Sequence, residues 1–295
     1  MDNVCHTLAG AALAESGLAR RTALGYATLL IGANLPDIDA LMYFHGADAA
    51  LYARRGWSHG VLAMVLLPLL LTGAIVLWSR WRRKPHDAAP PLRAAPLLAV
   101  ACLAVWSHPL LDWLNTYGVR LLMPFDRQWF YGDTLFIVDP WLWLLLAAGV
   151  VVGRSARAPA IIAWMLLAAA ASWLLLSRGL PPGIAIAWFA GLFAVLLLRW
   201  RLPPQRAGVV AQAGIAAALA YGALMFGLAR DAEARAAERF PGEYRIILPG
   251  ADLLPLFVLG WPELPESLFR NCVERCGCCD VLRFVFSRYE GVRWR

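Results

Sequence analysis

The sequence predicts an all-α polytopic membrane protein: a helical bundle of about 6–8 membrane helices with a small, partly β C-terminal extramembrane domain. Composition indicates the membrane, since 60% of the 295 residues are hydrophobic and 16% are charged, whereas soluble domains average about 45–50% and about 25%. The mean hydropathy of +0.58 agrees. Apolar runs of about 20 residues, the length that crosses a bilayer as a helix, recur along most of the chain.

Two short apolar segments come first, at 4–19 and 22–34. Each is too short to cross a bilayer comfortably, so we expect a partly buried helical hairpin. Full spans are expected at 61–79, 94–113, 136–153, 158–176, 183–200 and 208–229. The charged stretch RDAEARAAERF, from residue 230, predicts a separate short helix, and the apolar runs of strand length after it predict the partly β domain.

Basic residues are concentrated in alternate loops, which indicates how the chain crosses the membrane. The basic segments are 80–93, 154–157, 199–206 and the tip of the N-terminal hairpin with Arg20 and Arg21. The positive-inside rule places them in the cytoplasm, so 35–60, 114–135 and the tail after 230 face outward. This rule also explains the formal charge of +7. We therefore expect the lipid bilayer, and no nucleic acid, as the partner, because no basic helix or aromatic–basic module appears.

Residues 32–60, GANLPDIDALMYFHGADAALYARRGWSHG, interrupt the apolar chain with ionisable groups. These groups are Asp37, Asp39, His45, Asp48, Arg54, Arg55 and His59. An ionisable residue at or within a hydrophobic helix costs a few kcal/mol and therefore marks a candidate functional site.

His108 and Asp112 in SHPLLD are spaced i, i+4, so they share one face of a helix. This spacing suits two ligands of one metal, or one ligand and the carboxylate that orients it; a pair that only satisfies itself in a packed bundle is the alternative. Asp37 and Asp39 in PDID point in different directions. We expect one of them to bind metal and the other to orient a ligand or bridge a second metal.

His6, His59 and His108 are all expected at the outer membrane face, together with these aspartates. Imidazole and carboxylate ligands suit zinc or another divalent transition metal better than calcium. An open coordination position on such a metal would hold a water of lowered pKa, ready for hydrolysis. The sequence therefore predicts a divalent-metal site, most consistent with zinc.

Five sequence blocks in a fixed order point to a family. They are CHTLAGAAL, GANLPDID, RGWSHG, WSHPLLDWLNTYGVRLLMPF and YGDTLFIVDPW. Over roughly residues 1–145 the chain resembles the YdjM-like family of inner-membrane, metal-dependent hydrolases, although SHG at 58–60 stands where relatives often have THS. The resemblance implies a divalent-metal site and hydrolase activity in a bacterial inner membrane. The alternation of basic loops predicts that the site and the C-terminal domain lie in the periplasm.

The resemblance also implies which residues bind or support the metal. They are His6, Asp37, Asp39, His59, His108 and Asp112, of which Asp39 and Asp112 are the candidate catalytic carboxylates. Asp133 is a candidate further ligand, whereas Asp139, which precedes Pro140, is expected to cap a helix.

Other polar residues have simpler interpretations. Glu15 is expected to be a packed or interfacial carboxylate, His45 and His86 to be solvated, and Cys5 and Cys102 to be inert. The cluster at Cys272, Cys276, Cys278 and Cys279 allows disulfides, a zinc site or free thiols.

The chain is thus expected to contain a metal-site region (1–145), further transmembrane helices (146–229) and a small C-terminal domain (230–295). The expected reaction is hydrolysis of an ester or phosphoester in a small-molecule or lipid-like substrate. One alternative is a divalent-cation transporter, which would place ligands near the bilayer midplane on broken helices. The other is a non-catalytic membrane protein with a structural metal site.

Overall fold

The computed structural model describes residues 1–82, 92–177 and 182–239. The described elements are α1 (Asn3–Glu15), η1 (Leu18–Arg21), α2 (Gly25–Asn34), η2 (Leu35–His45), α3 (Ala47–Ala53), α4 (Val61–Arg82), α5 (Ala94–Trp113), α6 (Pro140–Arg154), α7 (Ala158–Leu176), α8 (Pro182–Arg201), η3 (Pro204–Arg206) and α9 (Ala207–Arg239). Within these residues the fold is helical, with two isolated β-bridges in the segment between α5 and α6. The partly β domain and the four C-terminal cysteines lie outside the described residues.

Five of the described helices are long and apolar enough to cross a membrane: α4, α5, α7, α8 and α9. The predicted span at 136–153 is shorter in the structure, because α6 begins at Pro140. The Asp139 side chain accepts a hydrogen bond from the Leu142 N–H at 3.0 Å, which confirms the expected cap. The resulting 15-residue helix is about 22 Å long, less than the roughly 30 Å of a hydrocarbon core.

The separate short helix expected after residue 230 is instead the last part of α9, which runs for 33 residues. No glycine or proline interrupts it beyond Gly227. Ion pairs one turn apart, Arg230 with Glu233 at 2.9 Å and Arg235 with Asp231, favour the helix there. The stretch at 35–60, expected as a loop, forms the short helices η2 and α3.

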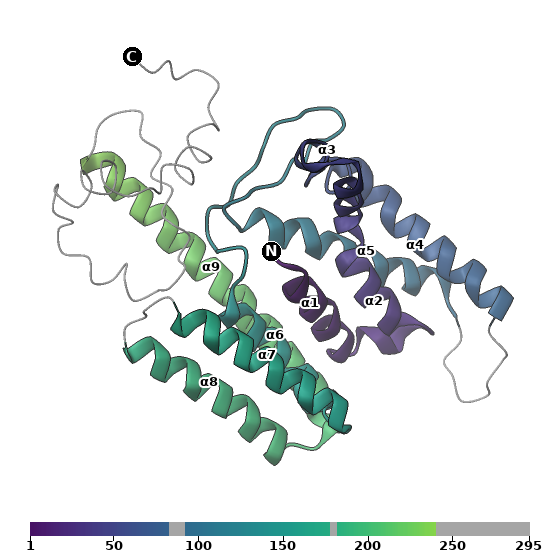
Figure 1. The fold of residues 1–295 in the computed structure, drawn as a ribbon. Coiled ribbons are helices and arrows are strands. Elements are labelled where there is room, and N and C mark those ends of the chain that lie inside the picture. The colour runs from purple at the N-terminus through teal and green to yellow at the C-terminus, as the bar shows by residue number, and fades with distance from the viewer. Residues whose placement is uncertain (83–91, 178–181, 240–295) are drawn as a thin grey trace.

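Helix α1 occupies the middle of the described bundle (Figure 1). One apolar cluster joins α1 to α6 and α9, through residues such as Leu8, Leu146 and Met225. A second cluster joins α1 and α2 to α4 and α5, through residues such as Leu29 and Leu97. Figure 1 shows α7 and α8 beside α6, at the edge away from α2 and α5. Helix α1 therefore packs directly against α2 and α5 on one side and against α6 and α9 on the other.

Small residues let these helices approach closely, as is common in membrane bundles. A Cβ added to Gly10 of α1 would lie 2.7 Å from the Leu29 carbonyl oxygen of α2. A Cβ added to Gly32 of α2 would lie 2.7 Å from Cβ of Ala104 in α5. Glycine at these two positions therefore draws α1, α2 and α5 together, and these three helices carry most of the candidate site.

Candidate metal centre

Four chain segments meet at one end of the bundle and bring the site residues together. His6 lies in the first turn of α1, and Asp37 follows the end of α2. His59 directly precedes α4, while His108 and Asp112 lie in the last turns of α5. Because neighbouring helices run in opposite directions, starts and ends of elements far apart in sequence become neighbours in space.

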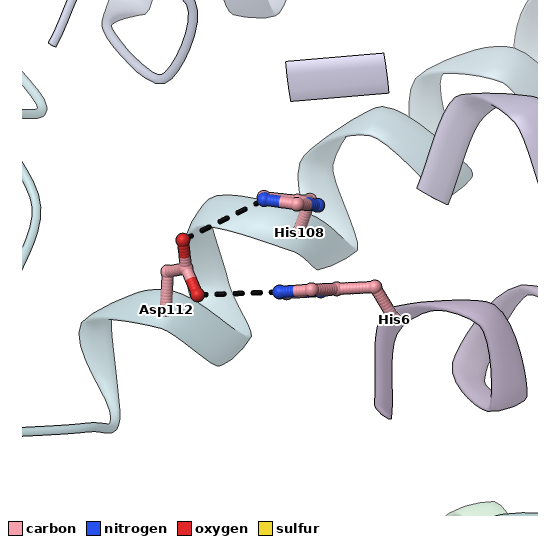
Figure 2. Close-up of side chains that lie close together, drawn as sticks. All are labelled: His6, His108 and Asp112. Atoms are coloured by element: carbon pink, nitrogen blue, oxygen red, sulfur yellow. Dashed lines mark hydrogen bonds and ion pairs between the residues drawn. The ribbon is translucent and has the colours of Figure 1, made fainter. Parts of the chain in front are cut away.

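The imidazoles of His6 and His108 stack, with ring centroids 3.6 Å apart and planes 12° from parallel. Figure 2 shows that each ring directs a nitrogen at a different oxygen of Asp112. His6 Nε2 lies 3.2 Å from Oδ1, and His108 Nε2 lies 3.5 Å from Oδ2. His59 meets His108 edge-on, and its Nε2 lies 3.2 Å from the same Oδ2. Three imidazoles thus face one carboxylate, and all four side chains are buried.

The hydrogen bonds at the outer nitrogens of two rings determine what faces Asp112. His108 Nδ1 lies 2.7 Å from the carbonyl oxygen of Ala33, so this nitrogen must donate a proton. His59 Nδ1 lies 2.9 Å from Ser58 Oγ and 3.5 Å from Asp39 Oδ2. With the proton on Nδ1, a neutral imidazole presents a lone pair at Nε2, the form in which histidine binds metal.

Several nitrogen and oxygen atoms that would bind a metal ion have no hydrogen-bond partners. His59 Nε2, His108 Nε2 and Asp112 Oδ2 are buried and have no partner in hydrogen-bond geometry, although 3.2 Å separates the first from the last. Arg55 Nε approaches Asp112 Oδ2 at 3.1 Å, but the two imidazole nitrogens that face this oxygen have no hydrogen-bond donor, and their lone pairs repel it. Buried polar atoms are rarely left unpaired. A cation among these atoms would remove both costs, so the residues fit a metal ion.

Burial also keeps two of the imidazoles in the form that binds metal. Desolvation, followed by the neighbouring His108, lowers the pKa of His6 to about 3. Desolvation likewise lowers the pKa of His59. Both rings are therefore neutral near pH 7, so no proton has to leave them before a metal binds.

Two groups of three side chains are compact enough to hold an ion, with ligand atoms within 4.8 Å of one another. One group is His6, His108 and Asp112, and the other is Asp37, His59 and His108. His108 belongs to both, yet only its Nε2 is free, because Nδ1 is bonded to Ala33. One nitrogen serves one ion, so the geometry favours a single centre to which these five residues contribute.

Asp39 takes a different position from Asp37. Its Oδ2 accepts the Arg55 backbone N–H at 2.7 Å and lies 3.5 Å from His59 Nδ1, on the side of the ring away from Asp112. Its Oδ1 accepts a hydrogen bond from Arg54 at 2.7 Å. The arrangement therefore favours Asp37 as the ligand and Asp39 as the carboxylate that orients His59.

Arg54 and Arg55 adjoin the centre, although the sequence alone predicts no role for them. Arg55 is buried, and its Nε lies 3.1 Å from Asp112 Oδ2. Its Nη1 donates to Asn115 Oδ1 at 2.9 Å and to the Gly118 carbonyl at 3.2 Å. The Met1 amino group also contacts Asp112. Two adjacent arginines beside aspartates in an apolar chain were the available signal, since a buried arginine needs an acidic partner.

Other candidates lie away from this centre. Asp133 is buried but belongs to neither three-residue group. His45 is exposed at the end of η2, as expected for a solvated side chain. Glu15, expected to be packed or interfacial, pairs with Arg154 Nε at 2.5 Å at the other end of α1. Cys5 and Cys102 are free thiols, and His86 lies outside the described residues.

Comparison with known proteins adds a family to this geometry. The model of the YdjM inner membrane protein family matches residues 1–181, which include every residue of the centre. A protein of Bacillus subtilis (strain 168) described as "Uncharacterized protein YfhP" is 22% identical over 169 residues, or 55% of this chain and 49% of that protein. The chain thus spans about half the length of this relative. No solved structure matches.

Proposed function

The chain belongs to the YdjM inner membrane protein family, and we propose that it is a membrane-bound, metal-dependent hydrolase. One observation carries the proposal. Buried acceptor atoms of His59, His108 and Asp112 converge without hydrogen-bond partners, at a place where His6 adds a further neutral imidazole. Such a set of donors is costly in an empty protein interior and is typical of a metal site.

His6, Asp37, His59, His108 and Asp112 are the residues that would hold the ion. Zinc is the divalent ion that suits these nitrogen and oxygen ligands best. It would supply Lewis-acid activation of a substrate oxygen and a water that ionises near neutral pH. The protein fixes the ligands: the Ala33 carbonyl orients His108, and Asp39 orients His59. Arg55 holds Asp112 in place from the side.

The depth of the centre supports a lipid-like ester or phosphoester as the substrate. His108 lies five residues before the end of the apolar helix α5, which is about 8 Å along the axis. Because the 20 residues of α5 match the roughly 30 Å of a hydrocarbon core, this position lies about 8 Å inside the boundary with the headgroups. Exposed aromatic side chains of the kind that favour the membrane–water interface surround this end of the bundle. They are Tyr43, Phe44, Trp57 and Phe125.

The same position speaks against a cation transporter. Transport sites lie near the midplane and are formed where helices are interrupted. Here the ligands lie at the starts and ends of elements, close to one end of the bundle. A structural metal site would use the same ligands, and only an activity measurement separates it from a hydrolase.

The test combines metal content with turnover. We expect the purified full-length protein to contain a divalent metal, and the double variant His59→Ala, His108→Ala to lose most of it, because sites that lose two ligands seldom retain zinc. His45→Ala is the matched control, since His45 is exposed and outside the centre. Metal content is read by mass spectrometry of the purified protein. Full occupancy in the double variant would place the metal elsewhere.

Activity is then measured on a panel of carboxyl esters and phosphoesters in detergent micelles. Hydrolysis that disappears with a chelator and returns with zinc supports the proposal. A protein that holds metal at this centre and hydrolyses neither class would instead have a structural metal site.

A further inference from the structure

We propose that Arg54 binds the substrate and that it selects a substrate carrying a phosphate group. This inference rests on the proposed metal centre and narrows its substrate class from esters in general to phosphoesters.

Three arginines adjoin the centre, and they differ in accessibility. The side chain of Arg55 is 4% exposed and is held by Asp112, Asn115 and Gly118. Arg120 is 6% exposed, and its Nη2 donates to the carbonyl groups of Tyr52 and Arg54. The side chain of Arg54 is 21% exposed. Arg54 is therefore the arginine of the three that an incoming molecule can reach.

The contacts of Arg54 connect it to the metal ligands. Its Nη1 lies 2.7 Å from Asp39 Oδ1 and 3.0 Å from Asp37 Oδ1. Both contacts use one nitrogen, so neither is the two-nitrogen fork that an arginine forms with a committed carboxylate partner. Asp37 also belongs to the metal-capable group with His59 and His108. An ion that takes Asp37 would leave Arg54 with Asp39 alone and free its guanidinium for another anion.

The balance of charge favours an anionic substrate. The carboxylates of Asp37, Asp39 and Asp112 face the guanidinium groups of Arg54 and Arg55, which leaves one formal negative charge. A divalent cation would convert this into one formal positive charge. The adjacent Arg120, which donates to the Arg54 carbonyl, adds a further positive charge.

Uncompensated charge is expensive at a site where most side chains are buried, so a loaded centre needs an anion. A phosphoester brings negative charge in its ground state, whereas a neutral carboxyl ester does not. Arginine also matches the planar pair of oxygens that a phosphate presents.

Metal and phosphate should therefore favour each other's binding. If bound zinc raises the affinity for phosphate by some factor, bound phosphate raises the affinity for zinc by the same factor, because both affinities belong to one thermodynamic cycle. This coupling can be measured on the full-length protein in detergent with inorganic phosphate as the probe and without turnover.

The experiment measures zinc content and phosphate binding in the wild-type protein and in Arg54→Gln, Arg54→Lys and Arg127→Gln. We expect Arg54→Gln to retain zinc but to bind phosphate about 10- to 100-fold more weakly, the range for losing hydrogen bonds to a charged group. Arg54→Lys keeps the charge and should fall in between. Arg127 is the control, because it is an exposed arginine that lies over Tyr52 in the same region.

Two further arms identify the source of the phosphate group. Glycerol phosphate and a short-chain phosphatidic acid are each used to displace bound phosphate from the zinc-loaded protein. Displacement by both supports recognition of the phosphate itself, and tighter displacement by the lipid indicates that the lipid is the natural source.

Several outcomes overturn the inference. The inference fails if the phosphate affinity of zinc-loaded Arg54→Gln is unchanged. It also fails if neither glycerol phosphate nor phosphatidic acid displaces phosphate from the zinc-loaded protein. Loss of zinc in both Arg54 variants would show that Arg54 only supports the metal ligands. A wild-type protein without any metal contradicts the proposed function itself, so the two failures are distinguishable.

Discussion

Asp112 is the residue on which the centre depends most. Its two oxygens face His6, His59, His108 and Arg55, and its own side chain is 1% exposed. A carboxylate in this position serves two purposes: it would bind the proposed metal ion, and it neutralises a buried guanidinium. The second purpose persists when no metal is bound, because Arg55 remains buried in either state.

We predict that Asp112→Asn lowers both metal binding and the stability of the fold, whereas Asp39→Asn lowers metal binding alone. Asparagine keeps the size but not the charge, so Asp112→Asn should lose most metal and lower the free energy of unfolding by about 3–5 kcal/mol, as when a buried ion pair loses one partner. Asp39→Asn should weaken metal binding about 10- to 100-fold, as when a group behind a ligand is removed. Chelator competition and thermal unfolding in detergent measure the two effects. Equal effects of the two substitutions would contradict the division of roles.

At this scale the sequence predicted one part of the centre better than the other. The spacing of His108 and Asp112 on a helix was sufficient to place them together, because helical geometry is regular. Asp37 and Asp39 lie in a region of turns and short 3₁₀ helix, where the direction of a side chain depends on what packs around it. The role of Arg55 required knowing that Asp112 lies beside it, a contact across 57 positions of sequence that no local pattern encodes.

The element on which the site depends is the short hairpin of α1 and α2. His6 is carried by α1, and the carbonyl oxygen of Ala33, which orients His108, lies near the end of α2. The two helices approach closely at Gly10, where an added Cβ would lie 2.7 Å from the Leu29 oxygen and 2.9 Å from Ala33 Cβ. The spacing of these helices therefore sets the geometry of two ligands.

We predict that Gly10→Ala lowers both thermal stability and metal affinity, because the methyl group forces α1 away from α2 and shifts Ala33. The matched control is Gly73→Ala on α4, where an added Cβ meets nothing within 4 Å. In that helix alanine should be neutral or slightly stabilising, since glycine is the poorer helix former by about 1 kcal/mol. Unfolding temperature and zinc content are compared for the two variants. A neutral Gly10→Ala would show that the hairpin tolerates a wider spacing.

Helix ends were predictable where local chemistry determines them. Asp139 followed by Pro140 is a strong start signal, and α6 begins there rather than at residue 136 as hydropathy alone suggested. The continuity of α9 was missed because the change from apolar to charged composition after residue 229 resembles a boundary. Charge at i, i+3 and i, i+4 spacing supports a helix in water as well, so a change of surroundings does not end it.

The two ends of the described bundle differ in the ionisable residues that they carry. The candidate metal centre lies at one end, and contacts between distant elements bring the arginine-bearing helix ends together at the other. Glu15 at the end of α1 pairs with Arg154 at the end of α6. The Arg93 backbone N–H at the start of α5 donates to Thr22, just before α2. Gln212 in the second turn of α9 donates to the Ser16 carbonyl. The positive-inside rule assigns this end to the cytoplasm.

The short helix α6 fits this polarity despite its length. Its 15 residues rise about 22 Å, and the four residues that precede it extend the chain by up to about 13 Å. The Ile137 carbonyl in that segment accepts the Asp2 backbone N–H at 2.9 Å, at the metal-centre end. The segment and α6 together connect the two ends, so the chain can return to the arginine-bearing end between α5 and α7.

We therefore predict that reporter fusions read cytoplasmic near residues 88 and 203 and periplasmic near residue 125 and after residue 235. The first two positions follow α4 and α8, whose ends carry arginines, and the third lies in the segment that contacts α3 beside the metal centre. Paired phosphatase and fluorescent-protein fusions at each position supply opposite signals and so control for expression. A cytoplasmic signal at residue 125 would invert the orientation. It would move His108 and Asp112 to the cytoplasmic face, because α5 fixes both at the end opposite Arg93.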